Sequence, residues 1–212
     1  WIASKLVERV ALITLDEKNL GQMSCNPSIG GVGKGIIVRE IDALGGIMGM
    51  ITDDSTIHSK ILNEMKGPAV WGPRAQTDRN LYHNSAKKHL KTRENIDIII
   101  AQVEDIELEN EEIRGVILTD GTKIPCKVVV LTTGTFLSGM ILLGKERIPA
   151  GRIGEQASYG LSKTLASFGF ELGRLKTGTP PRIFRDTIDF SQLEVQKGDV
   201  PPCPFSFVNT EI

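Results

Sequence analysis

Apolar and polar positions along the chain follow the mixed pattern of an α/β protein. An apolar run over Val10–Thr14 is typical of a short buried strand, and it follows what read as the last turns of a helix. Farther along, Ile37, Ile41 and Leu44 recur at helical spacing ahead of Gly45-Gly46, which supplies a stop. This pattern predicts a helix with the three apolar side chains on one face.

The apolar spacing predicts further helices downstream. Tyr82, Ala86 and Leu90 indicate an amphipathic helix that is capped by Thr77 and ends near Lys91. The other two are expected over Ser59–Lys66 and over Gln156–Gly169, the latter with Leu161, Leu165 and Phe168 on one side. A strand and then a turn are expected in ELGRLKTGTPPRI, which follows the last helix.

Four β-rich runs lie between the helix expected to end near Lys91 and the helix expected over Gln156–Gly169. Their short spacing, with Asp120-Gly121 as a hairpin turn, predicts an antiparallel meander. The last run, Val128–Thr132, is continuously apolar and is typical of a parallel strand covered on both faces. The predicted fold class is therefore α/β, a parallel sheet with an inserted antiparallel β-meander. From about Thr177 the sequence turns to Pro, Asp and isolated aromatics, which indicates passage into a second domain.

Composition narrows the class of protein. The chain has 212 residues, 40 % of them apolar, and a net charge of −1, so a globular core is expected and no polyanion partner is indicated by charge alone. No apolar run approaches the roughly 18 residues of a membrane helix. Cys25, Cys126 and Cys203 are far apart, which indicates reduced thiols in the cytoplasm rather than a disulfide framework or a metal site. Without an initiator Met, the chain is expected to begin mid-fold, after a strand and a glycine-rich turn.

The stretch MSCNPSIGGVGKG combines a cysteine with a glycine-rich turn. Its spacing matches neither a Walker loop nor a G-x-G-x-x-G dinucleotide fingerprint. Backbone N–H groups near Gly30–Gly35 can face an anion at a helix start, but a plain turn is the commoner reason for such glycines. Cys25 is either a small buried apolar residue or a nucleophile that the helix start and Lys34 favour as a thiolate. Cys126 and Cys203 lack such surroundings.

Two further groups are candidate binding residues. Thr133, Gly134 and Thr135 follow the predicted buried strand, at the sheet edge where open α/β folds bind ligands. Between Ser59 and Arg93 basic residues exceed acidic ones by about six, which fits either a phosphate-binding surface or a solvated helix face. The candidate RNA contacts are Arg74, Arg79, Lys87 and Lys88; Trp71, Arg74 and Tyr82 could stack on bases, although aromatic residues more often pack in the core.

Four long blocks then resemble one known family. They are LGQMSCNPSIGGVGKGIIVREIDALGG, KGPAVWGPRAQTDR, VVLTTGTFLSG and GRLKTGTPPRI, which lie within Val10–Ile183. Together they resemble the large flavin subunit of the tRNA uridine 5-carboxymethylaminomethyl modification enzyme, the glucose-inhibited division protein A family. Alternatives are a related folate- and FAD-dependent tRNA methyltransferase or other flavoprotein oxidoreductase, and a non-catalytic RNA-binding fragment.

The resemblance implies a cofactor, a substrate and partners. It implies an FAD-binding domain of the glutathione-reductase type over residues 1–176, without its N-terminal G-x-G-x-x-G unit, and the start of an inserted NAD-contacting domain over 177–212. The family uses FAD and NADH and acts with a GTPase partner subunit, as a homodimer, on C5 of the wobble uridine of certain tRNAs. By position, Val103 and Ser158 match FAD contacts, and Gly134 is expected to lie near them. Cys25 matches a cysteine of the family considered as a nucleophile toward the uridine.

Overall fold

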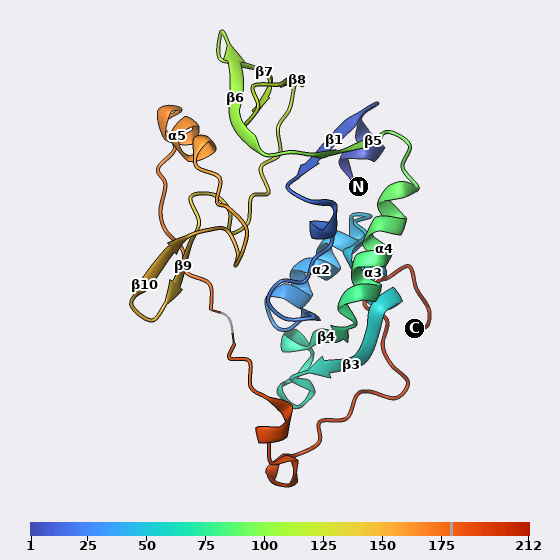
Figure 1. Cartoon of the computed structure of the whole chain (residues 1–212). Helices are drawn as coiled ribbons and strands as arrows, with labels where there is room; N and C mark the ends of the chain where they lie inside the picture. Colours follow the sequence, from blue (N-terminus) through green and yellow to red (C-terminus); the bar gives the residue numbers. More distant parts are fainter. Residues whose placement is uncertain (179) are drawn as a thin grey trace. The chain divides into compact units, whose positions relative to one another are not determined.

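The computed structural model describes residues 1–178 and 180–212, which form two compact units (Figure 1). Unit 1 comprises Trp1–Leu12, Glu17–Asp97 and Gly178–Ile212, and unit 2 comprises Ile13–Asp16 and Ile98–Thr177. The chain passes from unit 2 back into unit 1 where the sequence predicts a change of domain. The assignment of 177–212 to an NAD-contacting domain stays a prediction.

Strands β1 and β5 form a parallel pair. The Val10 N–H donates to the Asn95 carbonyl, and the Ala101 N–H donates to the Thr14 carbonyl, so the partners advance in the same direction along both strands. Strand β1 (Val10–Thr14) has the predicted bounds, and β5 spans Ile96–Ile100. The expected α/β class with a parallel pairing is confirmed.

Unit 1 packs helices on a three-stranded antiparallel sheet of order β2-β4-β3. Its core brings together the buried side chains of Ile29, Val38, Ile51, Ala75, Tyr82, Ala86 and Phe205. Because Phe205 is only 2 % exposed, the C-terminal segment (Gly178–Ile212) is part of this core. The elements are α1 (Ala3–Leu6), β2 (Ser28–Gly30), α2 (Lys34–Ala43), α3 (Met48–Ser55), β3 (Thr56–Leu62), β4 (Gly72–Thr77) and α4 (Arg79–Lys91).

Unit 2 contains the predicted meander. Strands β6, β7 and β8 pair antiparallel in chain order, and Asp120-Gly121 forms the turn between the last two, with Gly121 at a φ of 84°. A separate hairpin and one helix complete this unit. The elements are β6 (Val103–Glu109), β7 (Glu112–Leu118), β8 (Lys123–Pro125), β9 (Met140–Leu143), β10 (Glu146–Pro149) and α5 (Gly160–Ser167).

Short 3-10 turns connect several of these elements. They span Glu17–Asn19, Glu64–Lys66, Pro68–Val70, Arg185–Thr187 and Phe190–Gln192.

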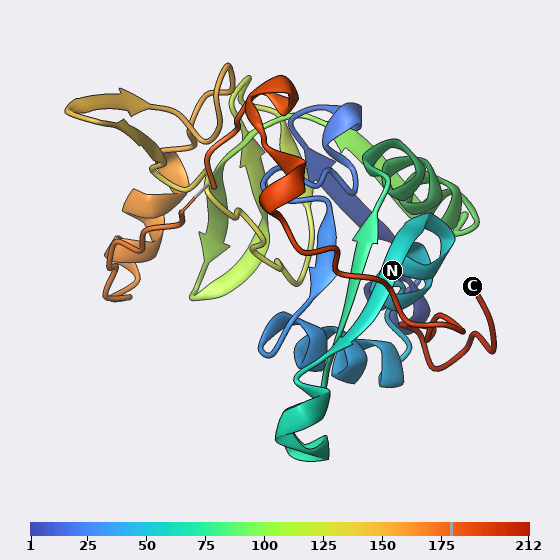
Figure 2. The same cartoon turned by 90° about the horizontal axis from the view of Figure 1, so that it is seen from below.

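The C-terminal segment runs along the rest of unit 1 (Figure 2), and carboxylates make two of its contacts there. At the first, Asp199 accepts hydrogen bonds from the Ile61 N–H at 2.6 Å and from Lys60 at 3.2 Å on β3. At the second, the buried Asp42 and Asp53 accept hydrogen bonds from residues 205–209. Side-chain acceptors thus satisfy the backbone of a segment that forms no strand of its own.

The predicted apolar face of α2 is wrong. Ile37, Ile41 and Leu44 point to solvent, and Leu44 is 81 % exposed. Val38 and Asp42 occupy the buried face instead. Asp42 is buried because the Ser206 hydroxyl and the Phe207 N–H donate to it. Because Asp42 is charged, the buried face of α2 does not show the helical spacing of apolar residues, and the sequence pattern identifies the wrong face.

Two secondary-structure predictions around β3 and α4 are also wrong. Residues 59–66 were expected to form a helix, but β3 pairs through Leu62 with β4, and only Glu64–Lys66 form a helical turn. Pairing with a distant strand overrides the local preference. Asp78, not Thr77, caps α4, because its carboxylate accepts from Asn80 and Leu81 N–H.

The buried strand expected at Val128–Thr132 is absent from the described part of the chain. Val128 and Val130 are each 75 % exposed, and no described strand pairs with this run. An apolar run forms a strand only where a neighbour accepts and donates its backbone hydrogen bonds. Downstream, α5 begins at Gly160 rather than Gln156 and ends at Ser167, ahead of Gly169 at a φ of 85°. The segment ELGRLKTG forms no strand.

The buried Tyr82 predicts a loss of stability at alkaline pH. Burial raises the pKa of Tyr82 to about 12, against a smaller opposing effect of its hydrogen bond with Thr52. Since the folded pKa exceeds the ordinary value of 10, this contribution to stability is present below pH 10 and is lost as pH rises toward 12. We expect the free energy of unfolding to fall by about 2 kcal/mol over this range.

Denaturant unfolding at a series of pH values measures this effect. In Tyr82→Phe that part of the pH dependence should disappear, because the ionisable phenol is gone. Tyr159, the chain's other tyrosine, is 46 % exposed. The Tyr159→Phe control should therefore keep the wild-type profile, and identical profiles for all three proteins would contradict the prediction.

Candidate functional site

The predicted cofactor residues of unit 2 come together around Ser158. The Ser158 hydroxyl donates to the Val103 carbonyl at 3.4 Å, and its backbone N–H donates to the Phe136 carbonyl at 2.8 Å. The Phe136 N–H in turn donates to the Thr133 carbonyl at 3.0 Å. The first residue of β6, the turn that begins at Thr133 and the loop that leads into α5 thus lie together.

The turn in this group has an open backbone. Gly134 has a φ of 56°, and a Cβ built on it would meet no described atom within 4 Å. Glycine is therefore required by the left-handed conformation and not by crowding. A flat ligand can approach the peptide planes of this turn directly. The turn does not end a strand, so the position at a sheet edge that the sequence suggested for it is wrong. The role of its residues in cofactor binding stays a prediction.

Cys25 lies in an exposed loop that precedes β2. Its carbonyl oxygen accepts hydrogen bonds from Nη2 of Arg79, at 3.3 Å, and from Nη2 of Arg182. Its Sγ faces the Gly178 carbonyl at 3.9 Å. The thiol is therefore accessible, and the alternative of a buried apolar cysteine is excluded.

The surroundings of Cys25 differ from those that sequence predicted. Strand β2 separates it from the start of α2, and the Lys34 ammonium donates to the Ser28 carbonyl at 3.1 Å. Two arginines, one on α4 and one in the C-terminal segment, supply the positive charge near this residue instead. Sequence reasoning missed Arg182 because it lies 157 residues from Cys25; its only signal was its place in the block GRLKTGTPPRI.

The other two cysteines have different environments. Burial raises the pKa of the Cys126 thiol, against a smaller opposing effect of a hydrogen bond from the Val128 backbone, which fits a structural role. Cys203 is exposed, and it lines a mainly apolar cavity of about 420 Å³ in unit 1 beside Ile36, Arg39, Trp71 and Phe207.

The glycines after Cys25 are explained by packing. The Gly31 N–H donates to the Pro73 carbonyl at 3.0 Å, and a Cβ at Gly30 or Gly35 would lie within 2.7 Å of that same oxygen. The turn between β2 and α2 is therefore pressed against β4, and larger residues would separate the two. This geometry favours the plain turn over an anion-binding loop.

Most of the predicted RNA-binding residues have partners within unit 1. Arg74 donates to the Gln196 side chain at 2.8 Å, Lys87 pairs with Glu17 at 2.6 Å, and Arg79 contacts the Cys25 carbonyl. Lys88 is exposed, and its side chain has no hydrogen bond or ion pair within residues 1–178 and 180–212. Tyr82 belongs to the core and is not available for stacking on a base.

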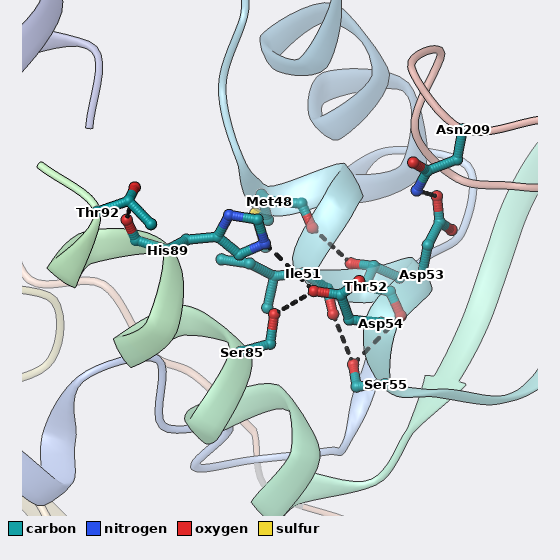
Figure 3. Close-up of polar contacts among 10 residues, drawn as sticks. All are labelled: Met48, Ile51, Thr52, Asp53, Asp54, Ser55, Ser85, His89, Thr92 and Asn209. Carbon is teal, nitrogen blue, oxygen red and sulfur yellow. Dashed lines mark hydrogen bonds and ion pairs between the residues drawn. The ribbon is translucent and has the colours of Figure 1, made fainter.

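A Ser–His–Asp group between α3 and α4 lacks the geometry of a catalytic triad (Figure 3). Ser85 Oγ donates to Asp54 Oδ2 at 2.5 Å, and His89 Nε2 lies 3.2 Å from the same oxygen. In a triad the histidine stands between the serine and the carboxylate, whereas here both side chains use the carboxylate. Together with the Asn209 contact to Asp53, these bonds hold the helices and the C-terminal segment together.

Metal-binding and membrane-spanning features are not found in the described residues. No three His, Cys, Asp or Glu side chains are placed to hold a metal ion there. Among the same residues, each helix is too short or too polar to span a bilayer.

Comparison with known proteins gives a consistent set of matches. The profile of the family described as glucose inhibited division protein A matches residues 1–212. The chain is 48 % identical over 99 % of its length to the mitochondrial 5-taurinomethyluridine-[tRNA] synthase subunit MTO1 of Macaca fascicularis, covering 32 % of that protein. It is 50 % identical over 97 % of its length to the tRNA uridine 5-carboxymethylaminomethyl modification enzyme MnmG of Borrelia garinii, covering 34 % of it.

A solved structure shows the same fold. The structure of Aquifex aeolicus GidA in its form II crystal matches 98 % of this chain with a TM-score of 0.91 and 49 % identity, and the match covers 34 % of that protein. The chain thus spans about a third of the length of these relatives.

Proposed function

Because this chain belongs to the glucose-inhibited division protein A family, we propose that the complete protein modifies C5 of the wobble uridine of certain tRNAs, using FAD and NADH. The proposal rests on two relatives that are 48 % and 50 % identical to this chain, because the names of both describe modification of uridine in tRNA. One is a 5-taurinomethyluridine synthase subunit and the other a uridine 5-carboxymethylaminomethyl modification enzyme. Both products carry a methylene group on C5 of uridine and differ in the amine attached to it.

The residues around Ser158 fit a role in holding FAD. Val103, Ser158, Thr133, Gly134 and Thr135 offer peptide groups, a hydroxyl and an open glycine turn in one group of loops. These groups suit a flat, polar cofactor that lies against backbone. When bound, FAD supplies the exchange of hydride with NADH. These loops of unit 2 would hold and orient one side of the cofactor.

Cys25 is proposed as the nucleophile toward uridine. Its thiolate would donate an electron pair to C6 of the base, and the C5–C6 π electrons would move toward C5 and the O4 carbonyl. The amine would first take the methylene unit from the folate as an iminium ion, with release of the folate nitrogen. The carbanion-like C5 would then attack the iminium carbon, so that the new C–C bond forms as the C=N π electrons move to the amine nitrogen. Loss of the C5 proton and departure of the thiolate from C6 would restore the double bond.

Partners and location complete the proposal. Arg74, Arg79, Lys87 and Lys88 are proposed to contact tRNA. Lys88 would do so directly, Arg79 through the donors that the Cys25 carbonyl leaves free, and Arg74 and Lys87 after exchange of their present partners. A GTPase partner subunit, a homodimer and a cytoplasmic location are part of the same proposal.

The test uses the complete protein. We expect it to purify yellow with bound FAD and to convert the wobble uridine of unmodified tRNA, as measured by nucleoside mass spectrometry with NADH and the GTPase partner present. A colourless protein whose activity does not depend on added FAD would contradict the proposed cofactor.

Ser158→Ala tests the assignment of the FAD contacts. Loss of one hydroxyl contact of about 1 kcal/mol should weaken FAD binding roughly fivefold, as measured by flavin fluorescence titration. Ser167 lies exposed at the end of α5, and Ser167→Ala should bind FAD as the wild type does. Equal affinities in both variants would remove Ser158 from the site.

A further inference from the structure

Two arginine side chains converge on one atom of the Cys25 loop. Arg79 is the first residue of α4, and Arg182 belongs to the C-terminal segment. One Nη2 of each donates to the Cys25 carbonyl oxygen, so the two guanidinium groups are near neighbours. Both residues are exposed. They therefore stand at the surface beside the residue proposed as the nucleophile.

This pair of cations has no anionic partner among residues 1–178 and 180–212. Arg9 is paired with Asp97, and Arg114 is paired with Glu109 and Glu112. Neither Arg79 nor Arg182 has such a carboxylate. Two like charges that share one acceptor repel each other, and an anion placed between them would relieve this repulsion. The charges thus point to a ligand that is itself negatively charged.

The free donors identify the chemistry of the anion. A guanidinium group has five N–H donors in a planar fork, and the shared carbonyl uses one from each arginine. The remaining donors match the paired oxygens of a phosphate group. In a nucleotide the phosphates are fixed to the same ribose as the base. Phosphate oxygens held beside Cys25 would therefore bring the base of that nucleotide to the thiol.

We infer that Arg79 and Arg182 bind a phosphodiester that flanks the target uridine and so position C6 of the base at Cys25 Sγ. The inference rests on the proposed function, because it takes an RNA containing the target uridine as the ligand. It assigns Arg79 and Arg182 to substrate positioning at the nucleophile rather than to general attraction of RNA. Their contribution is thus expected to depend on one particular phosphate.

The experiment neutralises that phosphate. Anticodon stem–loop RNAs carry a methylphosphonate on either the 5′ or the 3′ side of the target uridine, and their affinity for the complete protein is measured by fluorescence anisotropy. One of the two neutral linkages should weaken wild-type binding about tenfold. The double variant Arg79→Gln/Arg182→Gln should bind the unmodified RNA about tenfold more weakly and should not distinguish it from the neutral RNA.

Control variants separate this effect from loss of charge. Arg9→Gln/Arg114→Gln removes the same two charges from exposed ion pairs elsewhere in the chain and should respond to the neutral linkage as the wild type does. Arg79→Lys/Arg182→Lys keeps the charge without the planar fork and should recover only part of the sensitivity. Thermal unfolding of every variant verifies its fold.

Two results would overturn the inference. The first is that neither neutral linkage weakens RNA binding by the wild-type protein. This result does not depend on the folding of any variant. The second is an equal loss for the neutral RNA in the wild type and in the double glutamine variant. Failure of the proposed function looks different, since the wild-type protein would then bind no anticodon stem–loop and leave the uridine unmodified.

Discussion

Cys25→Ser in the complete protein is expected to lower the rate of wobble-uridine modification at least about a thousandfold while FAD remains bound. A serine hydroxyl is almost never ionised near neutral pH, so it cannot replace a thiolate that adds to C6 of the base. Cys25 is exposed and makes no core contact, so the substitution should leave the fold intact. Modified nucleosides are measured by mass spectrometry and FAD by its absorbance.

Cys203→Ser is the matched control for this prediction. Cys203 is also a free, exposed cysteine of unit 1. Its Sγ donates to the carbonyl of the next residue at 3.6 Å, and neither Arg79 nor Arg182 donates to its backbone carbonyl. We expect near wild-type activity from it. Normal modified-base levels in Cys25→Ser would remove the nucleophile from the mechanism, whatever Cys203→Ser does.

Asp53→Ala is expected to lower the free energy of unfolding by about 3 kcal/mol. Asp53 Oδ1 accepts from the Phe205 N–H at 2.6 Å, and Oδ2 accepts from the Ser206 N–H at 2.9 Å and from Asn209 at 2.8 Å. Alanine would leave two buried backbone donors without acceptors, at about 1–3 kcal/mol each. The corresponding fall in Tm is roughly 6–12 °C for a chain of this size.

Two further variants make the Asp53 prediction specific. Asp53→Asn keeps one acceptor oxygen and should lose less stability than alanine. Asp186 is exposed in the same C-terminal segment, and Asp186→Ala should change stability by no more than about 0.5 kcal/mol. If calorimetry gave Asp53→Ala the same Tm as Asp186→Ala, Asp53 would not hold the C-terminal segment.

Local pattern alone predicted several elements with their bounds. Val10–Thr14 forms the expected strand, α4 ends at Lys91 as expected, and the Asp120-Gly121 turn joins two strands of the meander. Each of these has a local signal in the sequence: an apolar run for the strand, helical spacing for α4 and an Asp-Gly pair for the turn. Cys25 could be singled out in the same way, from its neighbours in the chain.

Tertiary structure decided the features that depend on distant partners. Asp42 can lie on the buried face of α2 because residues of the C-terminal segment donate hydrogen bonds to it. Residues 59–62 form a strand because they pair with β4.

The amino-acid sequence by itself determined the α/β class, the meander and the cysteine to examine, because short-range periodicity and turn chemistry carry that information. Only the folded chain placed Arg79 and Arg182 together at Cys25. These two arginines are 103 positions apart in the sequence and meet only because the chain returns to unit 1 after unit 2. The spacing of neighbouring residues carries no information about that return.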